Sequence, residues 1–190
     1  VDTSPAVLLR LAERGTARLV HAIEGDMVTG LPAGPFALAF VAYNTLFNLT
    51  GDGDHAACFR AVAERLRPGG RFVAECFVPE HPPRRGDDVG VRTMTADRVV
   101  LSVARHDPER QSASGQFVEL TEAGGVRLRP WSIRYATPTQ LDALASAAGF
   151  VLEHRWEAFG GAPFGEDSAR HVSVYRLAGR DGGPADGPVP

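Results

Sequence analysis

Two acidic residues stand where a carboxylate could bind a nucleoside. Asp2 lies just ahead of a helix signal at Ser4-Pro5, and Asp26 belongs to the segment 18–27, which reads as a short strand ending in an acidic loop. A carboxylate at a strand end can accept hydrogen bonds from both ribose hydroxyls, and one beside a purine can accept from its exocyclic amine. Asp2 could equally be an acidic helix cap, and Asp26 an ordinary Gly-Asp turn.

The composition limits the partners that these carboxylates can serve. The chain has 190 residues, of which 44% are hydrophobic, and this suits one domain with a sizeable core. The formal net charge of −3 gives no electrostatic reason to expect nucleic acid or an anionic membrane as the main partner. Neither a secretory nor a membrane-spanning apolar run is present, so the sequence predicts a soluble, cytoplasmic protein. Cys58 and Cys76 are expected to be buried, reduced thiols.

The first half of the chain alternates between helix and strand patterns. Ser4-Pro5 predicts a helix N-terminus, and the apolar run 34–49 is of strand type. A second helix is expected to start at Asp54, as its cap, and to end at Pro68-Gly69-Gly70, after which 71–79 reads as another strand. Alternation at this spacing indicates right-handed crossovers and a largely parallel sheet.

The second half has a different pattern. Strand-like segments separated by turn signals fill residues 91–136, which predicts an antiparallel meander inserted into the α/β unit. Residues 137–140 form a capping box with Pro at the first helical position, and 150–159 and 171–178 read as the final strands. The last stretch, 179–190, has almost nothing to bury and is expected to be a disordered tail.

Taken in order, these segments resemble the class I S-adenosylmethionine-dependent methyltransferases, particularly their small-molecule branch. VDTSP is similar to the acidic loop after the family's second strand, EGDM to the adenine loop after the third, and FVAYNTLFNL to the fourth strand and its continuation. LRPGGRFVAECF resembles the approach to the fifth strand, and TPTQLDALASAAGFVLEHRW the last helix and sixth strand. The resemblance implies an α/β fold, a Rossmann-like sheet with the meander inserted after the fifth strand.

The resemblance also implies S-adenosyl-L-methionine as the cofactor. Asp2 would bind the ribose, Asp26 the adenine amine, and Met27 would lie against the adenine ring. Residues 42–45 would run beneath the methionine end, and Phe47 could pack near the sulfonium, although such a Phe is more often simply core. The cofactor-binding residues implied in this way are Asp2, Thr3, Gly25, Asp26, Met27, Ala42, Tyr43, Asn44 and Phe47.

Methyl transfer from a sulfonium depends on in-line alignment and exclusion of water more than on acid–base side chains. We therefore predict methyl transfer to N or O of a small-molecule acceptor. No general base is assigned, because His106, His154 and His171 each fit a structural role as well. The meander is expected to be a substrate lid or platform, although its aromatic residues could instead pack the domain or form a homodimer contact. No metal is expected. The expected acceptor pocket is lined by Tyr43, Phe77, Trp131 and Tyr135.

The chain departs from the family ahead of Asp2. The family's first strand, its glycine-rich loop and nearly all of its second strand have no counterpart there, which predicts an N-terminally incomplete sheet with exposed edges and a C-terminal part of a longer enzyme. The expected organisation is a partial cofactor-binding core at 1–90, the meander at 91–136, a completing helix and strands at 137–178, and the tail at 179–190. The alternatives are a non-catalytic methyltransferase-like subunit that needs a partner and, ranked last, a nicotinamide-dependent oxidoreductase.

Overall fold

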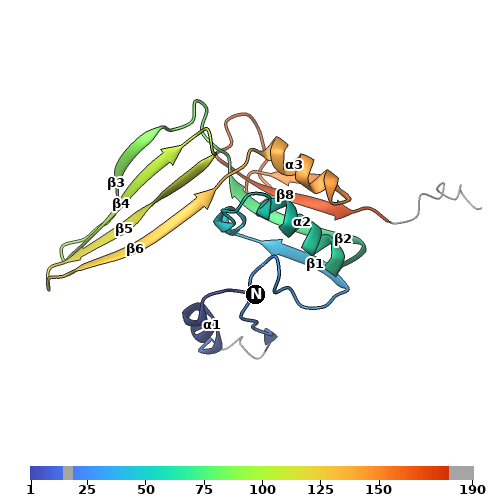
Figure 1. Cartoon of the computed structure of the whole chain (residues 1–190), viewed down its shortest axis with the longest axis horizontal. Helices are drawn as coiled ribbons and strands as arrows, with labels where there is room; N and C mark the ends of the chain where they lie inside the picture. Colours follow the sequence, from blue (N-terminus) through green and yellow to red (C-terminus); the bar gives the residue numbers. More distant parts are fainter. Residues whose placement is uncertain (15–18, 180–190) are drawn as a thin grey trace, which may run out of the picture.

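The computed structural model describes residues 1–14 and 19–179, and these contain two four-stranded sheets (Figure 1). The core sheet has the strand order β1-β2-β8-β7, with bounds Phe36–Val41, Leu66–Phe77, Arg170–Leu177 and Phe150–Trp156. The meander sheet has the order β3-β4-β5-β6, with bounds Gly86–Met94, Arg98–Asp107, Ser112–Thr121 and Val126–Arg134. Residues 180–190, where the tail is expected, lie outside the described residues.

The core sheet is mixed. β1 pairs with β2 in parallel, and β8 lies antiparallel between β2 and β7. The helices α2 (Asp54–Arg65) and α3 (Pro138–Ala147) pack on one face of this sheet. Beneath them, the rings of Phe59, Phe72, Phe150 and Tyr175 meet mostly edge to face, and all four are almost fully buried. The predicted α/β class is confirmed, and the hydrophobic core lies between these helices and the sheet.

Helix α2 buries one apolar face in the core, but its ends differ from expectation. Phe59 and Val62 are buried in the core. The N-cap residue is Gly53, whose φ of 81° suits glycine, and Asp54 is the first helical residue, its carboxylate accepting from Gly51 N at 2.8 Å. The helix ends at Arg65 rather than at Pro68, because the chain already pairs with β1 at Leu66.

Helix α3 begins as predicted. The Thr137 hydroxyl accepts from Gln140 N at 3.2 Å, and the Gln140 side chain accepts from Thr137 N at 2.8 Å, which completes the capping box. Leu141 and Ala145 then face the core. The two cysteines are also as expected, because Cys58 and Cys76 are free and buried, and burial raises the pKa of each thiol to about 12.

The N-terminal segment forms less sheet than predicted. A short helix α1 (Pro5–Ala12) is present, but the described part of 18–27 has a single parallel bridge, from Glu24 to Asp2, in place of a strand. A strand needs a hydrogen-bonding neighbour along its length, and within the described residues this segment finds one only at that bridge. The outer edge of β1 likewise has no partner there, and Leu38 and Phe40 are 54% and 70% exposed.

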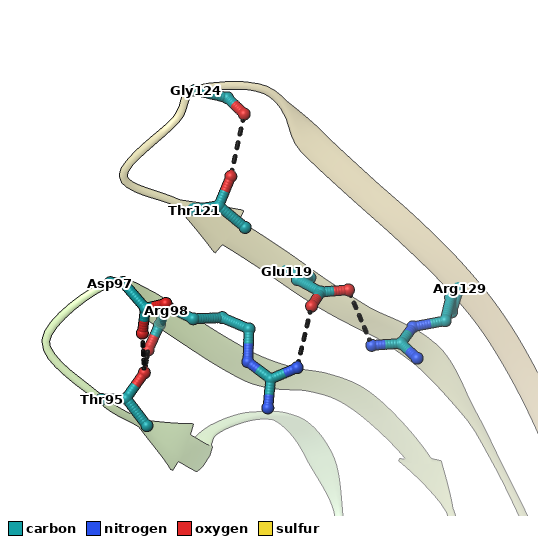
Figure 2. A network of polar contacts seen from close by, with 7 residues as sticks. All are labelled: Thr95, Asp97, Arg98, Glu119, Thr121, Gly124 and Arg129. Carbon is teal, nitrogen blue, oxygen red and sulfur yellow. Dashed lines mark hydrogen bonds and ion pairs between the residues drawn. The ribbon is translucent and has the colours of Figure 1, made fainter.

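The meander sheet is separate from the core sheet and extends away from it to one side (left in Figure 1). Its first strand begins at Gly86, five residues before the predicted start, and all three pairings are antiparallel. Figure 2 shows how its outer end is tied: Glu119 accepts from Arg98 at 3.2 Å and from Arg129 at 3.0 Å, linking three strands. Among the helices of the described residues, none is long and apolar enough to cross a membrane.

Candidate active site

The turn that follows β1 has an unusual backbone. Tyr43 and Asn44 both lie in the left-handed region, with φ of 57° and 60°. This conformation is unfavourable for L-residues, although Asn tolerates it best, so the surrounding contacts must hold it. Glu75 of β2 supplies two of them, because its carboxylate accepts from Tyr43 N at 2.8 Å and its carbonyl accepts from Asn44 N at 3.2 Å.

The Asn44 side chain fixes the same turn to the end of β2. Its amide oxygen accepts a hydrogen bond from Phe77 N at 2.6 Å. The Tyr43 side chain, by contrast, is 90% exposed. Strained backbone held by several bonds at the carboxyl end of a parallel strand is typical of a ligand-binding site.

A second group of predicted residues meets around the Asp2–Glu24 bridge. Asp2 N donates to Ile23 O and Gly25 N donates to Asp2 O, both at 3.1 Å, so the two acidic loops lie side by side. Asp2 Oδ1 also accepts from Ser4 N at 2.8 Å, which forms a turn ahead of α1, whose N-cap residue is Ser4 and not Asp2. Asp26 forms a turn, its Oδ1 accepting from Val28 N at 2.7 Å and from Thr29 N at 3.2 Å.

Each of the two carboxylates keeps an oxygen available. Oδ2 of Asp2 and Oδ2 of Asp26 have no hydrogen-bond partner among the described residues, and both side chains are partly exposed. Unpaired carboxylate oxygens on partly exposed side chains can accept hydrogen bonds from the hydroxyls and amines of a nucleoside. Each aspartate can therefore hold its local turn through Oδ1 and still bind a ligand through Oδ2.

The other predicted cofactor residues are placed differently. Met27 is partly buried against the hydrophobic core, and its carbonyl lies 4.0 Å from Cys58 Sγ. Thr3 is exposed, and Ala42 leads from β1 into the strained turn. Phe47 is fully buried in the core, with its ring edge-on to Phe77 at a centroid distance of 5.0 Å. The position of Phe47 is therefore that of a core residue, which is the alternative weighed for it above.

A cavity of about 360 Å³ lies between the end of β2 and the meander sheet, and we call it the inter-sheet cavity. Apolar atoms form most of its wall, and its volume is within the range of small-molecule sites. Phe77 connects it to the strained turn, because the Phe77 ring lines the cavity while its backbone binds Asn44. The cavity is lined by Phe77, Val78, Pro79, Glu80, Pro83, Arg84, His106, Ala113, Trp131, Ile133, Tyr135 and Ala169.

The polar groups of the cavity are few. Glu80 is held by Arg84 through two bonds of 2.8 and 2.9 Å, and this hydrogen bonding lowers the pKa of the Glu80 carboxyl. Burial, together with the nearby Asp107, raises the pKa of the Tyr135 hydroxyl. Trp131 lines the cavity, and its Nε1 is buried without a hydrogen-bond partner among the described residues.

The predicted acceptor residues are partly brought together. Phe77, Trp131 and Tyr135 line the inter-sheet cavity, whereas Tyr43 does not. The predicted pocket does not include His106 or the cavity-lining residues of the loop after β2. These loop residues are Val78, Pro79, Glu80, Pro83 and Arg84. Their location along the chain could have indicated Val78 and Pro79, because these residues directly follow β2 at its carboxyl end, where ligands bind in open α/β sheets.

The three histidines weighed as bases lie in different surroundings. His106 lines the inter-sheet cavity. His154 is exposed on β7 and stacks on Trp156 at 5.1 Å. His171 is fully buried on the helix side of the core sheet, with Nδ1 2.8 Å from Ser173 Oγ. Of the three, only His106 has a position from which it could touch an acceptor in the cavity.

Acidification is expected to destabilise the fold through His171. Burial, aided by the positive charge of Arg155, lowers the pKa of His171 from 6.5 to about 4. Between these values the unfolded chain binds a proton that the folded chain does not, so stability falls as the pH drops through this window, by up to about 3 kcal/mol. Urea unfolding across the window measures this slope. A His171→Leu variant should lose most of it, and an equally steep slope in that variant would contradict the assignment.

Known proteins that resemble this chain in sequence and in structure are methyltransferases. No family model matches the chain. It is 26% identical over 168 residues to the cypemycin N-terminal methyltransferase of a Streptomyces species, covering 86% of this chain and 67% of that protein. It superposes on the CcbJ methyltransferase of Streptomyces caelestis with a TM-score of 0.83 at 35% identity, covering 90% of this chain and 69% of CcbJ.

A further known structure shares the fold of this chain at much lower sequence identity. An S-adenosylmethionine-dependent methyltransferase of Clostridium acetobutylicum ATCC 824 superposes with a TM-score of 0.80 at 11% identity, covering 93% of this chain and 73% of that one. At this identity the likeness concerns the arrangement of strands and helices alone.

Proposed function

The chain belongs to the class I S-adenosylmethionine-dependent methyltransferases, and from that premise we propose that it methylates a nitrogen atom of a small molecule held in the inter-sheet cavity. S-adenosylmethionine supplies a methyl group that is already activated, so the residues of this chain have to position the acceptor and exclude water. The observation that carries the proposal is the link through Phe77, which joins the strained turn after β1 to the cavity wall.

The cofactor is proposed to lie along the carboxyl ends of the strands. Asp2 would accept hydrogen bonds from the ribose, Asp26 from the adenine amine, and Thr3, Gly25 and Met27 would border the nucleoside. The free Oδ2 atoms of the two aspartates support this placement, as does the Asp2–Glu24 bridge, which brings the two loops together. Tyr43 and Asn44, held in their left-handed turn by Glu75, would border the methionine end together with Ala42.

Nitrogen is favoured as the acceptor atom by the chemistry of the cavity. An alcohol would need a base to remove its proton, whereas an amine needs none beyond water. Glu80 is already bound to Arg84 through both of its oxygens, which makes it a poor base, so an alcohol would depend on His106 in the cavity lining for deprotonation. The name of the cypemycin N-terminal methyltransferase, the relative at 26% identity, points in the same direction.

The proposal is tested by supplying matched acceptors. Pairs of compounds that differ only in bearing an amine or a hydroxyl, drawn from amino sugars and short peptides, are incubated with S-adenosylmethionine, and formation of S-adenosylhomocysteine is measured. We expect turnover with amines and N-methylated products by mass spectrometry. Turnover confined to the hydroxyl members of the pairs would contradict the choice of nitrogen.

Replacing Trp131 by Ala is expected to raise the KM for the acceptor about tenfold with little change in kcat. Trp131 forms part of the cavity wall, and the loss of such an aromatic surface costs about 1.5 kcal/mol or more. Steady-state kinetics with the best amine give both parameters. Phe159→Ala is the matched control, because Phe159 is 62% exposed and lies outside the cavity lining. If the variant has a KM as low as that of the unmodified protein, Trp131 does not contribute to acceptor binding.

A further inference from the structure

The two faces of the meander sheet have opposite character. The inner face carries Ala113, Trp131 and Ile133, which line the inter-sheet cavity, and its Val100 and Ala104 are only 7% exposed. The other face, which we call the outer face, follows from the strand register. Its eleven apolar side chains are Val89, Val91, Met94, Val99, Leu101, Val103, Val118, Leu120, Val126, Leu128 and Pro130.

The register makes these eleven residues one continuous surface. Val91 pairs with Leu101, Leu101 with Val118, and Val118 with Leu128, so a row of apolar side chains crosses all four strands. Val89 and Val103 continue it toward the core sheet, where it ends at Gln116 and Pro130. Side chains on one face of a sheet alternate with those on the other, so the residues between these apolar positions, such as Glu119 and Arg129, belong to the inner face.

The outer face is open in the single chain. Val91 is 62% exposed, Met94 74%, Val126 63% and Leu128 58%. The inner face is by contrast covered by its own long side chains, such as Arg92, whose guanidinium lies 4.5 Å from the centroid of the Phe117 ring. A soluble monomer rarely exposes so wide an apolar face, and such a surface marks an interaction site.

The area suits a stable dimer. Four strands about 4.8 Å apart and nine or ten residues long at about 3.3 Å per residue give a face of roughly 500–600 Å² in projection. Side chains that stand out from this plane add to the accessible area, and a standard interface buries about 800 Å² per partner. A short peptide or a single added strand would leave most of this face exposed, whereas a second four-stranded sheet has the width to cover it.

We propose that a second copy of this chain covers the outer face, with the two meander sheets stacked face to face. The charged residues that the register places on this face are Asp87, Arg105, Asp107 and Arg134, two of each sign, and Asp87 pairs with Arg105 at 2.7 Å. A face of this kind has no surplus charge to select an acidic or basic partner. It is complementary to itself, as a two-fold interface requires, and two such sheets pack like the layers of a β-sandwich.

This arrangement leaves the site described above accessible, because the inter-sheet cavity lies on the opposite face of the meander sheet. It also identifies the charged inner face, with Glu119 between Arg98 and Arg129 (Figure 2), as the face turned away from the second copy. The proposal does not depend on the acceptor or on the reaction.

Sedimentation velocity of the full chain tests the proposal. We expect a species of twice the 20.3 kDa chain mass that dissociates only on dilution. A Val91→Glu, Leu128→Glu double variant places charge in the middle of the face and should sediment as a monomer at the same concentrations, with an unchanged far-ultraviolet circular dichroism spectrum. Should this variant fail to fold, Leu128→Glu alone serves, with a dimer dissociation constant raised at least tenfold.

The matched control is Phe40→Glu, because Phe40 is 70% exposed but lies on the edge strand of the core sheet. This variant should remain a dimer. The proposal is overturned if the unmodified chain is a monomer up to its solubility limit, if the outer-face variants stay dimeric, or if Phe40→Glu is the substitution that dissociates the dimer.

Discussion

Replacing Asn44 by Ala should lower kcat/KM for methyl transfer on the order of 100-fold. The Asn44 amide holds Phe77 N at 2.6 Å, and this bond sets the distance between the strained turn and the cavity wall. A displacement of about 1 Å at a site that works by alignment can cost roughly 100-fold in rate. The substitution also leaves Phe77 N without its partner and places Ala at a φ of 60°, which should cost about 2–4 kcal/mol of stability.

Two further variants separate these effects. Asn44→Gly accepts the left-handed backbone but lacks the amide, so it should recover part of the stability and little of the activity. Asn44→Asp keeps an oxygen that can accept from Phe77 N and should remain within a few-fold of the unmodified protein. Initial rates of S-adenosylhomocysteine formation, paired with thermal unfolding, give the comparison. Full activity in folded Asn44→Ala would show that the turn does not position the reactants.

Replacing Phe59 by Ala should destabilise the fold by about 4 kcal/mol. The Phe59 ring is fully buried and lies within 6.2 Å, centroid to centroid, of the rings of Phe72, Phe150 and Tyr175. Removing a ring from such a cluster loses the transfer free energy and leaves a cavity that the edge-to-face neighbours cannot fill.

Urea unfolding measures the loss at Phe59. Arg60→Ala is the matched control, because it changes the next residue of the same helix on its exposed face and should alter stability by less than about 0.5 kcal/mol. A Phe59→Ala variant that loses no more than about 1 kcal/mol would mean that the helix α2 packs less tightly on the core sheet than the structure has it.

Much of the fold could be predicted because local signals and tertiary packing agree. The capping box formed by Thr137 and Gln140, with Pro138 at the first helical position, starts α3 where the sequence predicts it. The period of Phe59 and Val62 identifies the buried face of α2, and the turn signals of the second half predict an antiparallel meander. The class I methyltransferase resemblance drawn from the motif order is confirmed by the match to CcbJ.

The errors occur where one interaction overrides another. Residues 18–27 have a strand-like sequence, but strand structure depends on pairing, and the described part of this segment pairs only through Glu24. Pro68 and Gly69 look like a helix stop, yet α2 ends earlier because Leu66 enters the parallel ladder with β1. In both cases a long-range hydrogen-bonded neighbour, which local sequence does not specify, decides the outcome.

The site was predictable by position and only partly by residue type. Phe77, Trp131 and Tyr135 meet in one cavity because one ends β2 and the other two lie on or just after β6. The left-handed pair at Tyr43 and Asn44 was not visible as strain, since neither residue is glycine and the conformation is imposed by bonds from β2. The role of Glu80 depends on Arg84 four residues away in a loop, a contact that no periodic pattern signals.

The most direct test of the account is a calorimetric titration of S-adenosylmethionine into the protein and into its Asp2→Asn variant. Asn keeps an oxygen for the bond from Ser4 N but replaces the free Oδ2 by an NH2 group, which cannot accept from the ribose hydroxyls, so the affinity should fall roughly 10-fold or more while thermal stability stays nearly the same. Asp97→Asn, at the far turn of the meander, should bind as tightly as the unmodified protein. Saturable binding that weakens only in Asp2→Asn is the predicted result. Absence of binding to the unmodified protein, or an equal affinity of the unmodified protein and Asp2→Asn, would contradict the assignment of the cofactor site.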